Sequence, residues 1–194
     1  MDAEMSHLGS ITTIWGEHLQ VAADLSTLAP DVDRVVALIA ESLAAGGGLL
    51  VCGNGGSAAD AQHIAAELTG RFFRDRRPLR AWPLHGNTSS LTAIGNDYGY
   101  EHVFAREVDA HGRAGDVLLA ISTSGNSPNV LRAIETAQAK GMKVVGLTGE
   151  TGGKMRHLCD ICIRVPSAST PRIQECHILI GHTICELLER MLCP

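Results

Sequence analysis

Apolar residues in the first 45 positions recur at helical spacing. They form two stripes, Leu8, Ile11, Trp15, Leu19, Ala22 and Leu25, then Val32, Val35, Val36, Ile39 and Leu43. Apolar positions three or four residues apart share one face of an α-helix. The pattern predicts helices over 5–28 and 31–45, with Pro30 between them, Asp31 as the cap of the second, and Gly46-Gly47-Gly48 after it.

From residue 49 onward, apolar runs of strand length alternate with helical segments. Strands are predicted at 49–52, 81–84, 116–121, 143–148 and 161–165, and helices at 57–71, 91–100, 128–140 and 172–192, with one more short helix before the last strand. Such alternation is typical of a parallel sheet with helices on both faces. No low-complexity linker divides the chain.

We therefore predict an α/β fold with a single domain over 1–194. N-terminal helices occupy 1–46, and a flavodoxin-like three-layer α/β/α core with a five-stranded parallel sheet occupies 47–194. The first helix exceeds what such a core needs. Its apolar stripe is expected to pack either against another subunit or within the chain, and the sequence leaves both open.

Composition excludes several classes of protein. The chain is 45% apolar and 19% charged with a net charge of −5, which is ordinary for a globular protein and unlike a nucleic-acid binder. No apolar run reaches the ~20 residues of a membrane span. The N-terminus lacks the basic and apolar regions of a signal peptide. We expect a cytoplasmic protein that binds neither nucleic acid nor membrane.

Six cysteines in a cytoplasmic chain are expected to be reduced thiols. Cys159 and Cys162 form a Cys-x-x-Cys motif, but no second pair completes a zinc knuckle. The motif leads into the strand predicted at 161–165. Buried structural thiols are therefore the favoured interpretation.

A glycine-rich turn, Gly53-Asn54-Gly55-Gly56-Ser57, joins the first predicted strand to an alanine-rich helix. Glycine lets the backbone turn sharply and approach a ligand, and the start of a helix favours an anion. One turn further in, His63 and Glu67 share a helix face. Together these features predict an anionic ligand beside a metal or an acid–base group.

A second turn, Ser122-Thr123-Ser124-Gly125-Asn126-Ser127, is the strongest phosphate signal. Its hydroxyls and backbone N–H groups lie between a strand and a helix that begins at Pro128. They can satisfy phosphate oxygens without a lysine. The alternative is a helix cap, but a cap needs only one such residue.

Two common nucleotide-binding patterns do not fit. The chain has no Gly-Lys-Ser/Thr, so a P-loop triphosphatase is excluded. Gly53-x-Gly55-x-x-Ala58 fits the dinucleotide fingerprint formally. The following strand, however, ends in Leu84-His85-Gly86-Asn87 without the expected acidic residue, so NAD is rejected as well.

The last predicted helix supplies further candidate ligands. Gln174, Glu175, His177 and His182 lie on it. His63 and Glu67 with one of these histidines and an amide oxygen would suit a tetrahedral divalent ion, although an exposed salt-linked pair remains the alternative. Gln174 and His182 are about 12 Å apart along a helix. Both reach one ion only if the helix start is irregular or two subunits contribute.

A basic run, Arg71 to Arg80, follows the helix that carries Glu67. Most of these arginines are interpreted as a solvated loop. Arg71 is the exception, because it is expected one turn beyond Glu67 on the same helix face.

Several motifs together resemble the sugar isomerase (SIS) fold and, within it, the phosphoheptose isomerase family. They are Asn54-Gly55-Gly56-Ser57, His63-x-x-x-Glu67, Leu68-Thr69-Gly70-Arg71, Asn96-Asp97-Tyr98-Gly99, Ser122 to Ser127, and Arg172-Ile173-Gln174-Glu175. The resemblance runs from about residue 5 to the C-terminus. It implies a homotetramer with active sites between subunits and one Zn²⁺ per subunit. It also implies interconversion of D-sedoheptulose 7-phosphate and D-glycero-D-manno-heptose 7-phosphate, toward activated heptose.

The resemblance also implies roles for individual residues. The zinc ligands would be His63, Glu67, Gln174 and His182. Substrate contacts would come from Asn54, Gly55, Gly56, Asn96, Asp97, Ser122, Thr123, Ser124 and Ser127, to which we add Ser57, Glu67, Arg71 and Gln174. In one departure, Ser167-Ala168-Ser169-Thr170-Pro171 lacks an aspartate that some members carry.

The implied reaction suits the residues. Moving a carbonyl from C2 to C1 needs a base for a carbon-bound proton, expected of Glu67, and an acid that serves the oxygens, expected of His182. A divalent ion would steady the enediolate. Two non-catalytic alternatives are a relative that binds the replication initiator and a sugar-phosphate sensor. Glu67 and His182 favour the enzyme.

Overall fold

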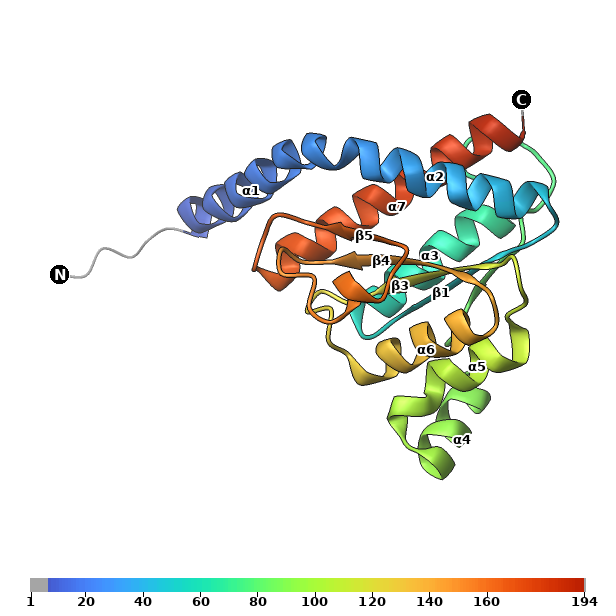
Figure 1. The fold of residues 1–194 in the computed structure, drawn as a ribbon. Helices are drawn as coiled ribbons and strands as arrows, with labels where there is room; N and C mark the ends of the chain where they lie inside the picture. The colour runs from blue at the N-terminus through green and yellow to red at the C-terminus, as the bar shows by residue number, and fades with distance from the viewer. Residues whose placement is uncertain (1–6, 194) are drawn as a thin grey trace.

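Five parallel strands form the centre of the computed structural model, which describes residues 7–193 (Figure 1). The strands are β1 (Leu49–Gly53), β2 (Ala81–Pro83), β3 (Val117–Ile121), β4 (Lys143–Thr148) and β5 (Ile161–Arg164). Their order is β2-β1-β3-β4-β5. Gly53 pairs with Ile121, so β1 and β3 end side by side. β1 and β3 are buried along their whole length, as parallel strands covered on both faces must be.

Helices cover both faces of this sheet (Figure 1). On one face α2 (Ala29–Ala44), α3 (Gly56–Thr69) and α7 (Thr170–Leu192) enclose a core that includes Ile39, Ile64 and Ile184. On the other, α5 (Val103–His111) and α6 (Pro128–Ala139) enclose a second core around Phe104 and Ile134, with α4 (Thr88–Tyr98) outside them. The predicted three-layer fold, its parallel five-stranded sheet and the leading helices are confirmed.

The N-terminal helices differ in detail from the prediction. α1 covers His7–Asp24, a 3₁₀ turn at Leu25–Leu28 follows, and α2 begins at Ala29. Residues 5 and 6 of the predicted helix lie outside the described residues. The prediction that Asp31 caps α2 is wrong, because the cap position is Leu28 and Asp31 pairs with Arg34 inside the first turn. Pro30 also lies inside α2, where its missing N–H costs nothing.

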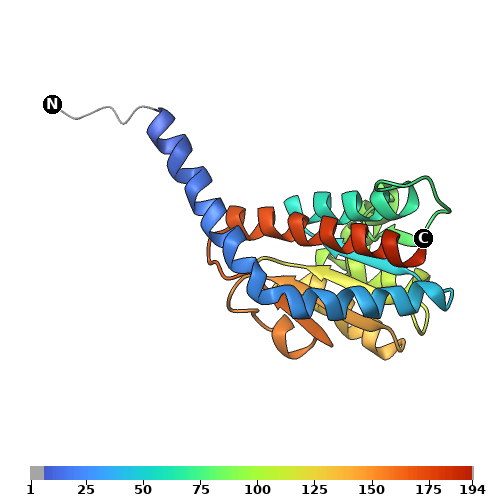
Figure 2. The ribbon, with the colours of Figure 1, turned by 90° about the horizontal axis from the view of Figure 1, so that it is seen from above.

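α1 projects from the rest of the molecule (Figure 2). None of its residues is buried, and Trp15 and Leu19 are 67% and 68% exposed. Its inner end meets α7, where His18 Nδ1 lies 2.8 Å from Glu175 Oε2. Within the described chain, therefore, no apolar surface buries the apolar stripe of α1.

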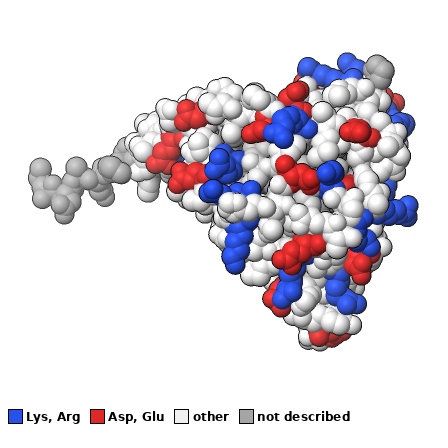
Figure 3. Space-filling view, in the orientation of Figure 1, with Lys and Arg blue, Asp and Glu red and all other residues white. Residues whose placement is uncertain are grey.

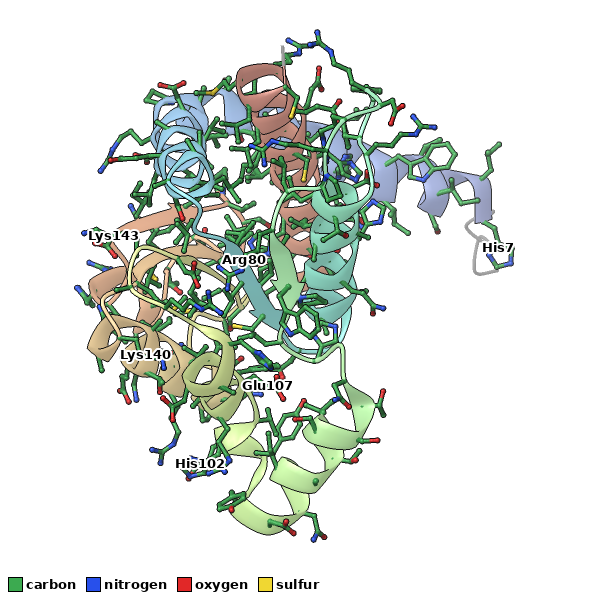
Figure 4. All side chains as sticks on the ribbon, turned by 90° about the vertical axis from the view of Figure 1, so that its right-hand side faces the viewer. His7, Arg80, His102, Glu107, Lys140 and Lys143 are labelled. Carbon is green, nitrogen blue, oxygen red and sulfur yellow. The ribbon has the colours of Figure 1, made fainter. Side chains whose placement is uncertain are left out.

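The sequence missed α5 altogether. Four of the nine residues of this short helix are charged or histidine, and only Val103, Phe104 and Val108 are buried apolar side chains. Three large apolar residues in nine, two of them adjacent, do not establish a helical period. The structure ties α5 to α4 through Glu107, which accepts a hydrogen bond from the Ser90 hydroxyl and lies between the two helices in Figure 4. The other elements predicted after residue 28 are present, with ends that differ from the prediction by at most three residues.

Candidate active site

Two turns meet where the strand order reverses. β1 continues to β2 on one side and β3 to β4 on the other, so the turns after β1 and β3 flank the switch point, the usual place for a ligand in such sheets. Gly55 has φ +57° in the first turn. The side-chain amides of Asn54 and Asn129 donate to each other's oxygens at 2.9 and 2.8 Å. This double hydrogen bond fixes the two turns relative to one another.

The hydroxyls of the second turn lie together. Ser122 Oγ is 3.0 Å from Ser127 Oγ and 3.5 Å from Ser124 Oγ. Ser127 occupies the cap position of α6 but makes no side-chain cap hydrogen bond. The helix-cap interpretation therefore does not explain Ser127. The cluster instead offers hydroxyls beside a helix N-terminus, the arrangement that suits a phosphate.

A third turn, residues 149–153, supports the second turn from behind. Gly149 N–H donates to Thr123 O at 2.9 Å, and Met155 N–H donates to Gly125 O at 3.2 Å. Gly125 and Gly153 both have positive φ, and a side chain on either would collide with the backbone of the other turn. Between them a cavity of about 310 Å³ opens, lined by Thr123, Ser124, Asn126, Gly149, Glu150, Thr151, Ser167, Ala168, Thr170 and Ile173.

The predicted acid–base residues also meet. His63 Nε2 on α3 is 3.0 Å from His182 Nε2 on α7 and 3.3 Å from Glu67 Oε1. Gly181 allows this, because a methyl group there would lie 2.7 Å from Cδ1 of Ile64. The close approach of the two helices brings the neighbouring residues, His182 and His63, into contact.

The spacing of these donors fits a metal, although they do not yet form a metal site. Two ligands of a tetrahedral zinc at ~2.05 Å are ~3.3 Å apart, close to the 3.0 and 3.3 Å observed. Among residues 7–193, no group of three His, Cys, Asp or Glu side chains is already arranged to hold an ion. A small rotation of exposed side chains would be needed.

Gln174 does not join the histidines within one chain. Its amide lies against Gly56, at the start of α3, where any side chain on Gly56 would displace it. α7 is regular from Thr170, so His182 lies ~12 Å further along. The start of α7 is therefore regular. Of the two conditions under which Gln174 and His182 could bind one ion, an irregular helix start is excluded, and only contributions from two subunits are left.

Asp60 lies one turn before His63 on α3. Burial raises the pKa of its carboxyl to about 6, and the charge of His63 opposes that rise. Its Oδ2 has no hydrogen-bond partner among the described residues. The acid–base group therefore sits beside a carboxyl that titrates close to neutrality.

The prediction that Arg71 continues the face of Glu67 is wrong. α3 ends at Thr69, and Gly70 turns the chain away with ψ −111°. The Arg71 side chain instead reaches Phe73 O at 3.5 Å. No contact in the described part of the chain joins it to Glu67.

The basic run contains a buried arginine that the sequence did not single out. Arg76 pairs with Glu189 at 3.0 Å, and both side chains are at most 3% exposed. Arg76 also donates to Glu67 O at 2.7 Å and Leu68 O at 2.8 Å, which caps the end of α3. Burial would raise the pKa of Glu189, but N–H groups of Phe73, Phe72 and Arg74 and the Arg76 guanidinium lower it to about 2. This pair anchors the helix turn that carries Glu67.

Asn96 and Asp97 form no hydrogen bond or ion pair with the other predicted site residues within the described chain. Both are exposed near the end of α4, and Asn96 Nδ2 donates to Asp97 Oδ1 at 2.8 Å. The described contacts include none to the other predicted site residues. Nearby Tyr100, however, donates its hydroxyl proton to Asn54 Oδ1 at 3.0 Å, which connects the segment after α4 to the first turn.

His177 is excluded from the acid–base group. It is fully buried and faces β4, where its Nε2 donates to Thr148 O at 3.1 Å. Burial lowers its pKa to about 4, and the hydrogen bond to Thr148 opposes this in part. The residue is therefore a neutral core histidine.

Asn129, Tyr100, Gly181 and Arg76 were missed by the sequence analysis. Each acts through a residue distant in the sequence: Asn129 and Tyr100 through Asn54, Gly181 through Ile64, and Arg76 through the carbonyls at the end of α3. Only Asn129 could have been singled out from the sequence, because it follows Pro128 directly after the second turn, Ser122 to Ser127, which we call the hydroxyl turn.

The helices of the described chain include none that is long and apolar enough to cross a membrane. Basic and acidic side chains alternate over the face in Figure 3, without a continuous basic patch.

Comparison with known proteins gives a consistent result. A family profile for the SIS domain matches residues 18–149. Phosphoheptose isomerase of Rhodospirillum rubrum is 58% identical to this chain, and the match covers 90% of this chain and 95% of the relative. Phosphoheptose isomerase of Helicobacter hepaticus is 51% identical, and the match covers 92% of this chain and 91% of the relative. The solved phosphoheptose isomerase of Neisseria gonorrhoeae superposes with a TM-score of 0.91 at 43% identity, covering 95% of this chain and all of the other. The chain therefore belongs to the SIS domain proteins and, among them, to the phosphoheptose isomerase family.

Proposed function

We propose that this protein is an aldose–ketose isomerase that converts D-sedoheptulose 7-phosphate to D-glycero-D-manno-heptose 7-phosphate. The observation that carries the proposal is the meeting of His63, Glu67 and His182 from two helices. It occurs in a chain that is more than half identical to phosphoheptose isomerases over nine tenths of its length. A sensor or an initiator-binding protein has no use for such a group.

The proton transfers follow from this geometry. Glu67 takes the proton from C1 of the ketose and returns it to C2. His182 supplies and removes protons at the two oxygens, which carries the carbonyl from C2 to C1. His63 lies between these two groups and holds both in place through its contacts at 3.0 and 3.3 Å. Only 22% of the Glu67 side chain is exposed, which limits competition from water for the base.

The phosphate is assigned to the hydroxyl turn. Ser122, Ser124 and Ser127 present neutral donors beside the start of α6. Along α3 the distance from Gly56 to His63 is ~10 Å. An elongated sugar phosphate with its reacting end away from the phosphate suits that separation.

We propose Zn²⁺ as the cofactor, held by His63, Glu67 and His182, with Glu67 and His182 free of the ion when they exchange protons. Two nitrogens and a carboxylate oxygen at this spacing are ligands that zinc accepts. A bound divalent ion supplies polarisation of the carbonyl. Metal analysis of the purified protein tests this, with about one ion per chain expected and much less in His63→Ala. Equal metal content in the two proteins would refute these ligands.

We further propose a cytoplasmic homotetramer with sites between subunits. The exposed stripe of α1 supports this, as does an apolar groove of about 500 Å³ between α2 and α7, lined by Ala22, Leu25, Ser26, Leu28, Ala29, Val32, Asp33, Leu179, Ile180, Thr183 and Leu187. The separation of Gln174 from His182 also supports it, because Gln174 would join the ion of His182 only from a neighbouring subunit. Light scattering should give about four times the 20.5 kDa of one chain. A fully active monomer would contradict the proposal.

The deciding experiment is incubation with D-sedoheptulose 7-phosphate in deuterium oxide, followed by NMR. An aldose product with deuterium at C2 is expected, as is deuterium at C1 of recovered ketose. Binding of the sugar phosphate without deuterium uptake, with zinc present, would refute the isomerase and leave a binding protein.

A further inference from the structure

Cys159 and Cys162 lie outside the site described above, on the segment that leads into β5. Cys52, Cys176 and Cys185 are buried, as expected, but this pair is partly exposed. A methyl group on Gly146 of β4 would lie 2.8 Å from Sγ of Cys159 and 3.4 Å from Sγ of Cys162. Both sulfur atoms therefore occupy the space over a single glycine.

The surroundings of the pair are basic. A cavity of about 390 Å³ opens there, lined by Asp31, Arg34, Arg156, His157, Cys159, Asp160, Ile161, Cys162 and Arg164. Its two carboxylates are already paired, Asp31 with Arg34 at 3.0 Å and Asp160 with Lys143 at 2.9 Å; Lys143 lies at the start of β4 in Figure 4. Within residues 7–193, Arg156 and Arg164 form no ion pair. Because no carboxylate of the described chain neutralises these two arginines, their positive charge favours the thiolate form of Cys162.

The two thiols respond in opposite directions. Hydrogen bonding from Cys159 lowers the pKa of Cys162 to about 7 against the effect of burial, with help from Thr148, whose Oγ1 is 3.7 Å away, and from Arg164 and Arg156. The same contact and burial raise the pKa of Cys159. The pair therefore combines a cysteine that ionises more readily than an ordinary thiol with one that stays protonated. A partly exposed thiolate in a basic pocket next to a second cysteine is the typical setting of an oxidation-sensitive pair.

We propose that Cys162 and Cys159 form a reversible oxidation site for peroxides. The Cys162 thiolate attacks one oxygen of hydrogen peroxide. An S–O bond forms, the O–O bond breaks and hydroxide leaves, so that sulfur loses two electrons and becomes a sulfenic acid. The Cys159 sulfur then attacks Cys162, an S–S bond replaces the S–O bond, and the departing hydroxide takes the thiol proton as water. A dithiol reductant reverses the step.

The site is placed behind the hydroxyl turn. A side chain on Gly152 would lie 2.7 Å from Cβ of Arg156 and 3.0 Å from Cδ of Arg164. Lys154, which lies between Gly152 and Arg156 in the sequence, donates its N–H to Asn126 Oδ1 at 3.0 Å. Arg156 therefore directly follows the segment that holds the hydroxyl turn, and Arg164 at the end of β5 packs beside that segment at Gly152.

The wild-type protein itself provides the first test. Trypsin cuts after Arg156 and Arg164, so one peptide carries both cysteines. Reduced protein is treated with hydrogen peroxide at pH 7, alkylated and analysed by mass spectrometry. We expect this peptide to lose two hydrogens before Cys193, also partly exposed, is modified, and to regain them with dithiothreitol. Peroxide that modifies Cys193 while leaving this peptide reduced would overturn the proposal.

Variants separate the two roles. Cys159→Ser should stop at a sulfenic acid on Cys162, trapped as a dimedone adduct, whereas Cys162→Ser should leave Cys159 unmodified. Arg164→Gln should slow alkylation of Cys162 at pH 7 about threefold, because less thiolate is present. Arg164→Lys should restore the rate, and Arg34→Gln, whose arginine is already paired, is the matched control. Equal oxidation of Cys159 in Cys162→Ser would overturn the assignment of the attacking thiol.

Discussion

The hydroxyl turn and the acid–base group are built in different ways. Ser122, Ser124 and Ser127 lie within six consecutive residues, and backbone contacts with the turn at 149–153 hold them. His63 and His182 are 119 positions apart and meet because Gly181 lets two helices approach. The first region depends on backbone geometry and the second on side-chain packing. Substitutions in the hydroxyl turn should therefore affect substrate binding, and substitutions in the acid–base group should affect turnover.

The largest effect is expected for Glu67→Gln. The amide keeps the shape and an oxygen but cannot accept a carbon-bound proton, so kcat should fall ~10²–10⁴-fold. Binding of the sugar phosphate, measured by calorimetry, should change little. Glu135→Gln, at an exposed position of α6, is the control. Wild-type turnover by Glu67→Gln would show that Glu67 is not the base.

Next comes the pH dependence of stability through His177. Its folded pKa of about 4 lies below the ordinary histidine value of 6.5, so as pH falls below 6.5 the unfolded chain binds a proton that the folded chain does not. Stability is complete above pH 6.5 and should fall by up to about 3 kcal/mol toward pH 4. Urea unfolding between pH 4 and 7.5 measures this. His177→Gln should show a flatter profile, and an unchanged slope would point to other groups.

Ser124→Ala should act on binding alone. Loss of a hydrogen bond to a charged phosphate costs ~1.5–3 kcal/mol, which corresponds to a ~10–150-fold rise in KM with kcat largely kept. Ser89→Ala, on exposed α4, serves as control. If KM stays at its wild-type value in the Ser122, Ser124 and Ser127 variants alike, the phosphate lies elsewhere.

Gly181→Ala tests the packing of α3 against α7. The added methyl group meets Ile64 at 2.7 Å, and such overpacking costs ~1–3 kcal/mol of stability. kcat should fall more than KM rises, since His182 moves relative to His63. Ile64→Val removes the colliding Cδ1, so the double variant should recover part of both losses. A double variant no better than the single one would refute the contact as the cause.

The smallest effect is expected for Tyr100→Phe. It removes one neutral hydrogen bond to Asn54, worth ~0.5–1.5 kcal/mol, and KM should rise about two- to tenfold. Asn129→Ala removes both amide contacts to Asn54 and should raise KM further. The reverse order of the two variants would show that Asn54 is positioned mainly by Tyr100.

The sequence predicted local features better than distant contacts. The sheet, the order of its elements and the position of the hydroxyl turn follow from patterns within about ten residues. The sequence could name His63, Glu67 and His182, but not that Gly181 packs on Ile64 and joins them. Arg71 was misplaced because the spacing rule assumed that α3 continues, whereas Gly70 ends it. Arg76 resembled its solvated neighbours, since its partner Glu189 is more than a hundred residues away.

The projecting α1 has a spectroscopic consequence. The chain has only two tryptophans, Trp15 on α1 and Trp82 on the edge strand β2. Both side chains are exposed in the single chain. A helix with no buried residue is marginal by itself. If subunits of the proposed tetramer cover α1, the emission of Trp15 should depend on protein concentration, whereas that of Trp82 should depend on the folding of the sheet. Trp82→Phe and Trp15→Phe would therefore give two fluorescence probes of one chain, one for assembly and one for folding.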